Sequence, residues 1–144
     1  MKLESIFDNW EQDSKIDRTD LGHASLAISE LHHKYFKVYS NERLILRKYE
    51  ADLRQLKLSK FEFYTQGPTK ETMELGWVLP PVGKVLKAEV NTYIEADSDV
   101  IHLTLKIGVQ HEKIELLESI IKTLTNRGFQ IKTALDWIKF QSGS

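Results

Sequence analysis

Apolar positions recur at helical spacing through the central part of the chain. Residues 24–63 contain neither proline nor glycine, and apolar side chains follow one another there at steps of three, four or seven residues, which is one face of an α-helix. Thr19 or Asp20 can cap its start. The pattern predicts one long helix that ends near residue 63. Its apolar face comprises Leu31, Tyr35, Val38, Ile45, Tyr49, Leu53, Leu56 and Phe63.

A second pattern, in the last third of the chain, is a heptad seam whose steps alternate between four and three residues. Neighbouring apolar positions widen this face beyond that of a two-stranded coiled coil. The seam has two interpretations, which are packing within the chain and self-association, with Gln110 as a polar residue that fixes register. As an oligomerisation surface it comprises Leu103, Ile107, Gln110, Ile114, Leu117, Ile121 and Leu124.

Turn-forming residues separate these two patterns. All three prolines and three of the seven glycines lie between residues 67 and 83, so this window is expected to be a connection. Beyond it, residues 85–96 can form a shorter helix, and Asp97, Ser98 or Asp99 can cap the next one. Gly128 in "NRG" predicts a helix end, with a short final helix after it.

These elements predict a mainly α protein with one domain. We expect a long N-terminal helix and C-terminal helices with a heptad seam, assembled as a closed homo-oligomer. Within the domain, residues 1–66 form the N-terminal helical part, residues 67–83 the connection, and residues 84–144 the C-terminal helical part that is expected to serve oligomerisation.

Composition excludes several classes of protein. The chain has 144 residues and no cysteine, which excludes disulfide scaffolds, thiolate zinc sites and cysteine nucleophiles. No apolar run approaches the roughly 20 residues that cross a bilayer, and no secretory signal is evident. We therefore expect a cytoplasmic protein without a membrane partner.

Catalytic and metal-binding patterns are absent from the sequence. His32 and His33 are adjacent and point to different sides of a helix, while His102 and His111 share a face only loosely. There is no phosphate-binding loop, dinucleotide fingerprint or nucleophile elbow. The sequence predicts no enzyme, no catalytic residue, no metal site and no cofactor.

Charge is unevenly distributed although the net charge is only −1. Residues 31–63 carry 8 basic and 4 acidic side chains, whereas residues 1–30 carry 3 basic and 7 acidic ones. At about 100° per residue, four cations of the basic segment fall within a band about 80° wide; Lys60 continues the row, and aromatic residues follow. Cations and aromatic rings together are typical of single-stranded nucleic-acid binding. The candidate residues are Arg43, Arg47, Arg54, Lys57, Lys60, Phe61, Phe63 and Tyr64.

The same band has a simpler interpretation as a solvated helix face. Glu50 lies inside it and can pair with Arg47 and Arg54 at helical spacing. Five cations on single-stranded DNA would also give a salt slope of only about −3.5. Useful affinity therefore needs several copies of the band on one strand.

Four segments resemble the UvsY-like recombination mediators of T-even-like bacteriophages, in the same order along the chain. The block at 126–143, with its R-G-F-x-I-K core and F-x-x-G end, is the most specific, and residues 68–94 are unmatched. The segments are "DSKIDRTDL" (13–21), "LKLSKFEFYTQG" (56–67), "EADSDVI" (95–101) and "NRGFQIKTALDWIKFQSG" (126–143).

The resemblance implies a non-enzymatic mediator of DNA recombination, repair and replication. Such proteins are closed homo-oligomers of roughly six or seven subunits that bind single-stranded DNA and help a RecA-like phage recombinase replace the phage single-strand DNA-binding protein. The family's motif is Leu-Lys-Ala-Arg-Leu-Asp-Tyr-Tyr. Here Lys60 takes the arginine position, while Leu58 stands at the lysine position, so Lys57 or Arg54 takes that role.

Two other functions remain open from the residues alone. One is a helical protein–protein adaptor whose basic band pairs with its own acidic N-terminal segment. The other is a structural component of a phage particle. The segment 68–94, which includes "GWVLPPVG", has no assigned role in any of these interpretations.

Overall fold

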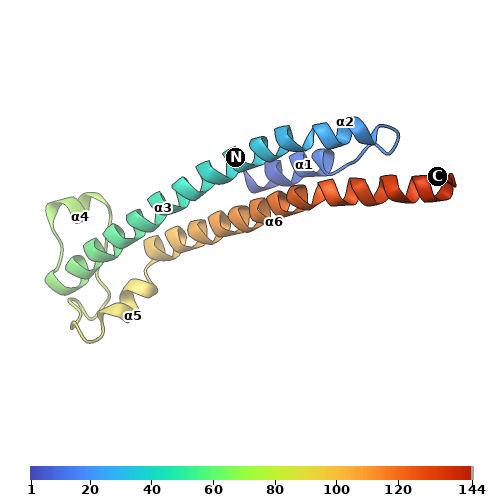
Figure 1. The fold of residues 1–144 in the computed structure, drawn as a ribbon. Helices are drawn as coiled ribbons and strands as arrows, with labels where there is room; N and C mark the ends of the chain where they lie inside the picture. The colour runs from blue at the N-terminus through green and yellow to red at the C-terminus, as the bar shows by residue number, and fades with distance from the viewer. Residues whose placement is uncertain (144) are drawn as a thin grey trace. The chain divides into compact units, whose positions relative to one another are not determined.

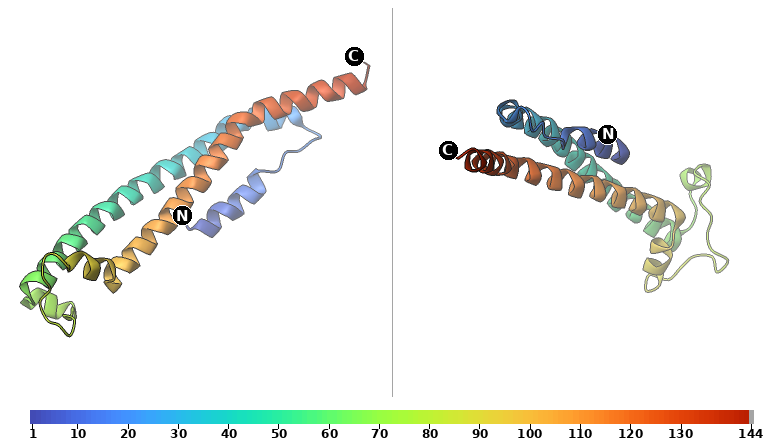
Figure 2. Two further views of the ribbon diagram at one scale, coloured as in Figure 1. Left: turned by 90° about the horizontal axis from the view of Figure 1, so that it is seen from below. Right: turned by 90° about the vertical axis from the view of Figure 1, so that its right-hand side faces the viewer.

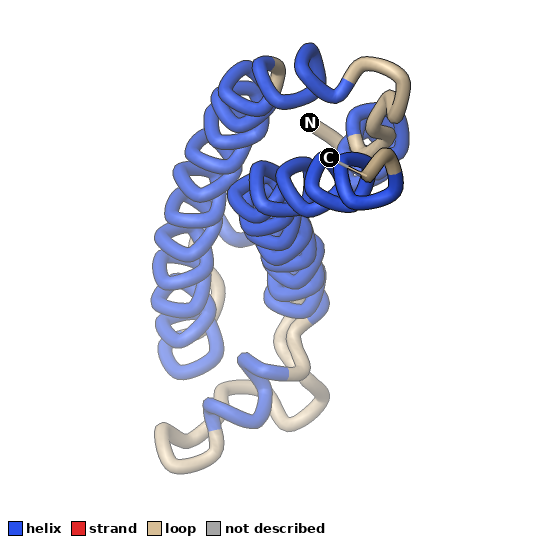
Figure 3. The backbone as a smooth tube through the Cα atoms, turned by 45° about the vertical axis from the view of Figure 1, so that its right-hand side comes forward, coloured by secondary structure: helices blue, strands red, loops and turns tan. Residues whose placement is uncertain are grey.

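The computed structural model describes residues 1–143, and the regular structure among them is entirely α-helical (Figure 3). The mainly α prediction is confirmed. No helix in this range is long and apolar enough to cross a membrane. In chain order the helices are α1 (Leu3–Asp13), α2 (Leu21–Leu26), α3 (Ile28–Gln66), α4 (Lys70–Glu74), α5 (Val90–Glu95) and α6 (Ser98–Gln141) (Figure 1).

The chain forms two compact units whose boundaries fall inside the two long helices. Unit 1 comprises Met1–Ile45 and the chain from Val109 onward, and unit 2 comprises Leu46–Gly108. The boundaries therefore do not coincide with the proline- and glycine-rich window, which lies wholly within unit 2. The single domain divided at residues 66 and 83 stays a prediction.

The long helix predicted between residues 24 and 63 is present as α3. It begins a few residues later than expected because the short helix α2 precedes it. The Asp20 side chain caps α2 by accepting a hydrogen bond from the His23 amide at 3.1 Å. One of the two predicted N-caps is therefore correct, although it serves α2.

The prediction that Gly128 ends a helix is wrong, because α6 continues through it to Gln141. Gly128 is not among the glycines with positive φ. Arg127, directly before it, and Ile131, three residues after it, are both buried at 4% exposure. Tertiary packing on both sides of Gly128 outweighs the roughly 1 kcal/mol that glycine costs inside a helix.

The predicted helix over residues 85–96 is shorter in the structure and begins only at Val90. Val85 instead donates its backbone N–H to the carbonyl of Tyr64 at 2.8 Å, so it joins the end of α3. The predicted cap of the next helix is confirmed. One carboxylate oxygen of Asp97 accepts the amides of Asp99 and Val100 at 2.9 and 3.3 Å, at the start of α6.

The core of unit 1 is built from three helices. Ile6 of α1, Tyr35 of α3 and Leu117 of α6 are all buried in one apolar cluster, which Ile120 and Leu124 complete. Figures 1 and 2 show α1 lying beside both long helices in this unit. The Tyr35 hydroxyl donates to Asp13 at 2.7 Å and so ties the end of α1 to α3.

The core of unit 2 joins the end of α3 to α5 and the start of α6. It contains Phe63, Tyr64, Val90, Ile94 and Val100, all buried. Trp77 and Leu79 of the connecting segment pack against the same cluster. The segment predicted to be a simple connection therefore contributes to this core, and it also contains α4, whose N-terminus is closed by a capping box at Thr69.

Candidate nucleic-acid interface

Four of the predicted cations form an exposed band along α3. Arg43, Arg47, Arg54 and Lys57 are all exposed. Within residues 1–143, no carboxylate lies at ion-pair distance from any of the four. The expected pairing of Glu50 with its neighbouring arginines is therefore not formed. Cations without carboxylate partners are free to contact phosphate oxygens.

Lys60 does not share this exposure. Its side chain is 3% exposed, and its ammonium lies 2.8 Å from Asp99 and 3.1 Å from Asp97. The same ammonium lies 3.7 Å from the ring centroid of Trp77. A lysine ammonium has three donors, and two carboxylates and one aromatic face occupy them. The structure thus places Lys60 inside unit 2 and not on the surface to which the sequence assigned it.

Asp97 connects this lysine to the start of α6. One carboxylate oxygen caps the helix, and the other accepts the Tyr64 hydroxyl at 2.6 Å as well as Lys60. Burial alone would raise the pKa of Asp97, but the hydrogen bonds from Tyr64 and Lys60 outweigh it and hold that pKa below its ordinary value. Burial and the hydrogen bond to Asp97 raise the pKa of Tyr64.

The predicted aromatic residues lie mostly in the core. Phe63 and Tyr64 are 3% and 8% exposed, and Phe63 packs edge-on against Trp77 with centroids 5.5 Å apart. Only Phe61 is half-exposed. In this conformation Phe63 and Tyr64 have no ring face on which a base could stack, so they support the helix that carries the cations.

The heptad seam is largely used within the chain. Four of its residues are buried, namely Gln110, Ile114, Leu117 and Leu124, while Leu103, Ile107 and Ile121 are half-buried. The burial of these residues agrees with packing within the chain, which is one of the two interpretations of the seam. A role of the seam in oligomerisation stays a prediction.

The polar position of the seam has a specific partner on α3. The Gln110 amide donates to the backbone carbonyl and the carboxylate of Glu42 at 2.7 and 2.6 Å. Glu42 is 2% exposed, and the Met1 ammonium lies 2.9 Å from its other carboxylate oxygen. Burial would raise the pKa of Glu42, but these hydrogen bonds outweigh it and lower that pKa.

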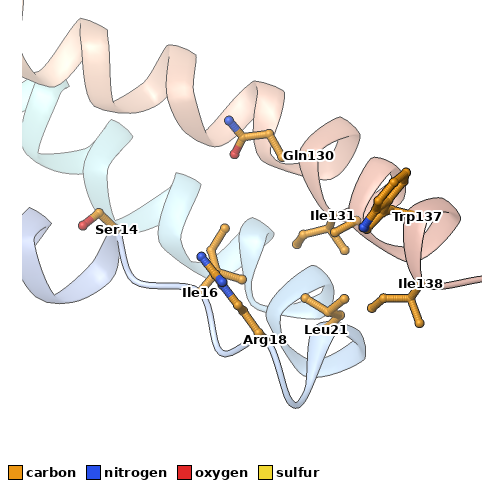
Figure 4. Close-up of a pocket in the computed structure, with 9 residues that line it drawn as sticks. Ser14, Ile16, Arg18, Leu21, Gln130, Ile131, Trp137 and Ile138 are labelled. Atoms are coloured by element: carbon orange, nitrogen blue, oxygen red, sulfur yellow. The ribbon is translucent and has the colours of Figure 1, made fainter. Parts of the chain in front are cut away.

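Sequence reasoning missed an apolar surface on the C-terminal part of α6. Phe129, Trp137, Ile138 and Phe140 are 50–73% exposed. Beside them a groove of about 620 Å³ separates α6 from the segment before α2 (Figure 4). In "FQIKTALDWIKF" the charged residues Lys132, Asp136 and Lys139 share one helix face, which leaves the apolar side chains on the others, but the helix break expected at Gly128 hid this pattern. The groove is lined by Ser14, Ile16, Arg18, Leu21, Gln130, Ile131, Ala134, Trp137 and Ile138.

No group of three or more histidine, cysteine, aspartate or glutamate side chains within residues 1–143 is arranged to hold a metal ion. The four histidines singled out in the sequence, His32, His33, His102 and His111, take part in no such group.

Comparison with models of known protein families identifies one family that matches most of the chain. Residues 9–144 match the model of the family described as "Recombination, repair and ssDNA binding protein UvsY". No curated protein sequence matches the chain.

Solved structures share the fold. The chain superimposes on crystal structures of the bacteriophage T4 recombination mediator protein UvsY in three lattice types. For lattice type I the TM-score is 0.81 at 19% identity, covering 95% of this chain and 98% of that one. For lattice type II the TM-score is 0.83 at 20% identity, covering 99% of this chain and 98% of that one. For lattice type IV the TM-score is 0.79 at 20% identity, covering 98% of this chain and 99% of that one.

Proposed function

This chain belongs to the UvsY family, and we propose that it binds single-stranded DNA and acts as a recombination mediator. In this role it promotes loading of a RecA-like phage recombinase in place of the phage single-strand DNA-binding protein, in the host cell cytoplasm. It does so by binding alone, without catalytic turnover. The observation that carries the proposal is the band of four exposed cations on α3 that have no carboxylate partner within residues 1–143.

The band is suited to the sugar–phosphate backbone and not to base sequence. Arginine and lysine contacts to phosphate position a strand without reading it. The expected binding is therefore tolerant of sequence. Since Phe63 and Tyr64 are in the core, Phe61 is the aromatic residue of the segment that remains available for a stacking contact.

One band is too weak to hold DNA by itself. Four cations on single-stranded DNA give a salt slope of about −2.8, at about −0.7 for each contact. We therefore propose that several protomers place their bands along one strand and gain affinity through effective concentration. The exposed apolar residues of α6, Phe129, Trp137, Ile138 and Phe140, supply an association surface for a closed homo-oligomer.

The mediator step follows from differential binding. A protein can shift a strand from one state to another only if it binds the second state more tightly. The oligomer therefore has to prefer the strand conformation that accepts recombinase over the one covered by single-strand binding protein.

A salt titration with a fluorescent oligonucleotide tests DNA binding. The slope of the logarithm of the association constant against log salt is expected near −2.8 for each protomer engaged. Lys57→Ala and Arg54→Ala should each reduce its magnitude by about 0.7, while Lys132→Ala, an exposed lysine on α6, should leave it unchanged. Absence of oligonucleotide binding, or equal effects of all three substitutions, would reject the proposal and favour a protein–protein adaptor.

A further inference from the structure

Aromatic side chains continue the cation band toward the start of α3. Four side chains follow one another there at steps of four, three and four residues, which makes them neighbours on the helix surface. At about 100° per residue they fall within a sector about 60° wide. No carboxylate of residues 28–43 falls within that sector. We call the four side chains the aromatic row, and it comprises His32, Phe36, Tyr39 and Arg43.

Contacts join the members of the row from one end to the other. The rings of His32 and Phe36 are nearly parallel, at 11°, with centroids 5.9 Å apart. Those of Phe36 and Tyr39 lie 6.0 Å apart at 57°. The Arg43 guanidinium lies over the Tyr39 ring, 5.3 Å from its centroid. Three rings and the first cation of the band therefore form one continuous surface, which lies wholly within unit 1.

The ring of Phe36 is open to solvent. It is 47% exposed, while His32 and Tyr39 are half-buried. Two parallel rings in full contact would lie about 3.5–4 Å apart, so at 5.9 Å the His32 ring leaves most of the Phe36 face uncovered. A base can therefore reach a ring face here, which Phe63 and Tyr64 in the core of unit 2 do not offer.

The row is held in place by contacts behind it. The Tyr39 hydroxyl donates to the Glu118 carboxylate of α6 at 2.8 Å, and the Tyr39 side chain packs against the apolar cluster of unit 1. A ring with a fixed orientation loses little conformational entropy when a ligand binds. Because Arg43 rests on this ring, its guanidinium lies beside the aromatic surface before any strand arrives.

The combination of rings and a cation indicates the kind of ligand. A nucleotide supplies a flat base for a ring and a phosphate for the cation. An apolar protein surface would instead bury the Arg43 guanidinium without an opposite charge, which costs free energy. From His32 to Tyr39 the row spans about 10 Å of the helix axis, which is the length of about three nucleotides at 3.4 Å each.

We propose that the aromatic row is a base-stacking site, in which bases of the single strand stack on Phe36 and the rings beside it while Arg43 contacts the adjacent phosphate. The inference rests on the proposed function, because the strand is the one that the cation band holds. It adds contacts to the bases, which the cations of the band do not make. It also supplies the aromatic part of the interface, for which the sequence had indicated Phe63 and Tyr64. All four bases have a π-face, so the site is tolerant of sequence.

Oligonucleotide binding by variants of the full chain tests the site. Phe36→Ala should weaken binding to a mixed-sequence oligonucleotide about fivefold or more. The salt slope should stay unchanged, because no phosphate contact is lost. Phe36→Trp, which keeps an aromatic ring, should bind as tightly as the unmodified chain. Phe7→Ala is the matched control and should have no effect, since Phe7 is 53% exposed and lies on α1 of the same unit.

A strand of abasic deoxyribose phosphates separates stacking from other effects. It keeps the phosphates and lacks the bases, so Phe36→Ala and the unmodified chain should bind it equally. Equal affinity of the two proteins for the ordinary oligonucleotide would overturn the inference, and so would an equal loss on both strands. A fall in the mass of the Phe36→Ala assembly, measured by light scattering, would also overturn it, because the row would then lie between copies of the chain. If the unmodified chain binds neither strand, the DNA-binding proposal itself is rejected, and the stacking site with it.

Discussion

The ammonium of Lys60 lies over the face of Trp77, 3.7 Å from the ring centroid, and does not point to solvent. Because Asp97 and Asp99 hold the same ammonium, the lysine that the family motif assigns to DNA is part of the core of unit 2. The exposed cations one turn and more before it remain on the surface. Lys60 therefore fixes the end of the helix that carries them.

Lys60→Met should destabilise the protein without removing a phosphate contact. Breaking a buried ion pair costs about 3–5 kcal/mol, and the exposure of Asp99 puts this case near the lower limit, about 3 kcal/mol. Urea unfolding measures that loss. In conditions where the variant is folded, the salt slope of DNA binding should equal that of the unmodified protein. Lys57→Ala is the control, which should keep the stability of the fold and reduce the salt slope of DNA binding. A reduced salt slope for Lys60→Met would instead show that Lys60 contacts DNA directly.

Restoring the charge balance should rescue the Lys60→Met variant. Asp97→Asn and Asp99→Asn together remove the carboxylates that Lys60→Met leaves without a cation, while an asparagine can still cap α6. The triple variant should recover much of the lost free energy of unfolding. A triple variant less stable than Lys60→Met would contradict the ionic origin of the effect.

Acid should unfold the protein through its buried carboxylates. The pKa values of Glu42 and Asp97 are lowered in the folded state, so these groups stabilise the fold at pH values above the ordinary carboxyl pKa, about 4. As pH falls below that value, the unfolded chain takes up protons first and the free energy of unfolding decreases. Urea midpoints between pH 6 and 3 measure this decrease. Glu42→Gln should give a shallower dependence, and parallel curves would contradict the assignment.

Arg127→Met should release the end of α1. The Arg127 guanidinium donates to the backbone carbonyls of Asp13 and Ser14 at 3.1 and 3.2 Å, and hydrogen bonds from charged groups contribute about 1.5–3 kcal/mol. Hydrogen exchange should accelerate in α1 before it does in unit 2. Lys132→Met, at an exposed position five residues later, should leave α1 protected. Uniform acceleration across the chain would indicate that Arg127 acts on the whole fold.

Gly128→Ala should stabilise α6. Gly128 is helical, and a Cβ atom there would meet no atom within 4 Å, so alanine gains about 0.5–1 kcal/mol. Gly108→Ala, in the same helix and with equal space, should behave alike. Gly76→Ala should have the opposite sign, because at φ 76° an added Cβ costs about 1–2 kcal/mol. Thermal unfolding of the three variants gives the comparison.

The sequence predicted the elements whose signals are local. The period of three and four residues located α3, and Asp97 was among the predicted caps of α6. The helical period also predicts the face of α3 on which Lys60 lies. It lies eighteen residues after Glu42, which is five full turns, and both are on the face that carries Tyr35 and Val38. Arg43, one residue after Glu42, is on a different face.

The remaining features depend on residues far apart in the chain. Gln110 forms a hydrogen bond with Glu42, which is 68 residues away in the sequence, and Arg127 forms one with Asp13, which is 114 residues away. No periodicity within α6 shows that its seam is covered by α1 and α3. The helix break expected at Gly128 was wrong for the same reason, because contacts with distant segments outweigh a local preference.

The enclosure of Lys60 also makes it a chemical reference within the molecule. Among residues 1–143 it is the only lysine classed as buried, and acylating reagents reach amines through solvent. Mass spectrometry after brief acetylation would thus find Lys60 unmodified with or without an oligonucleotide, while Lys57 would lose its label only when a strand covers it. In acetylation footprinting of this protein, Lys60 can therefore serve as the internal reference for an unmodified lysine.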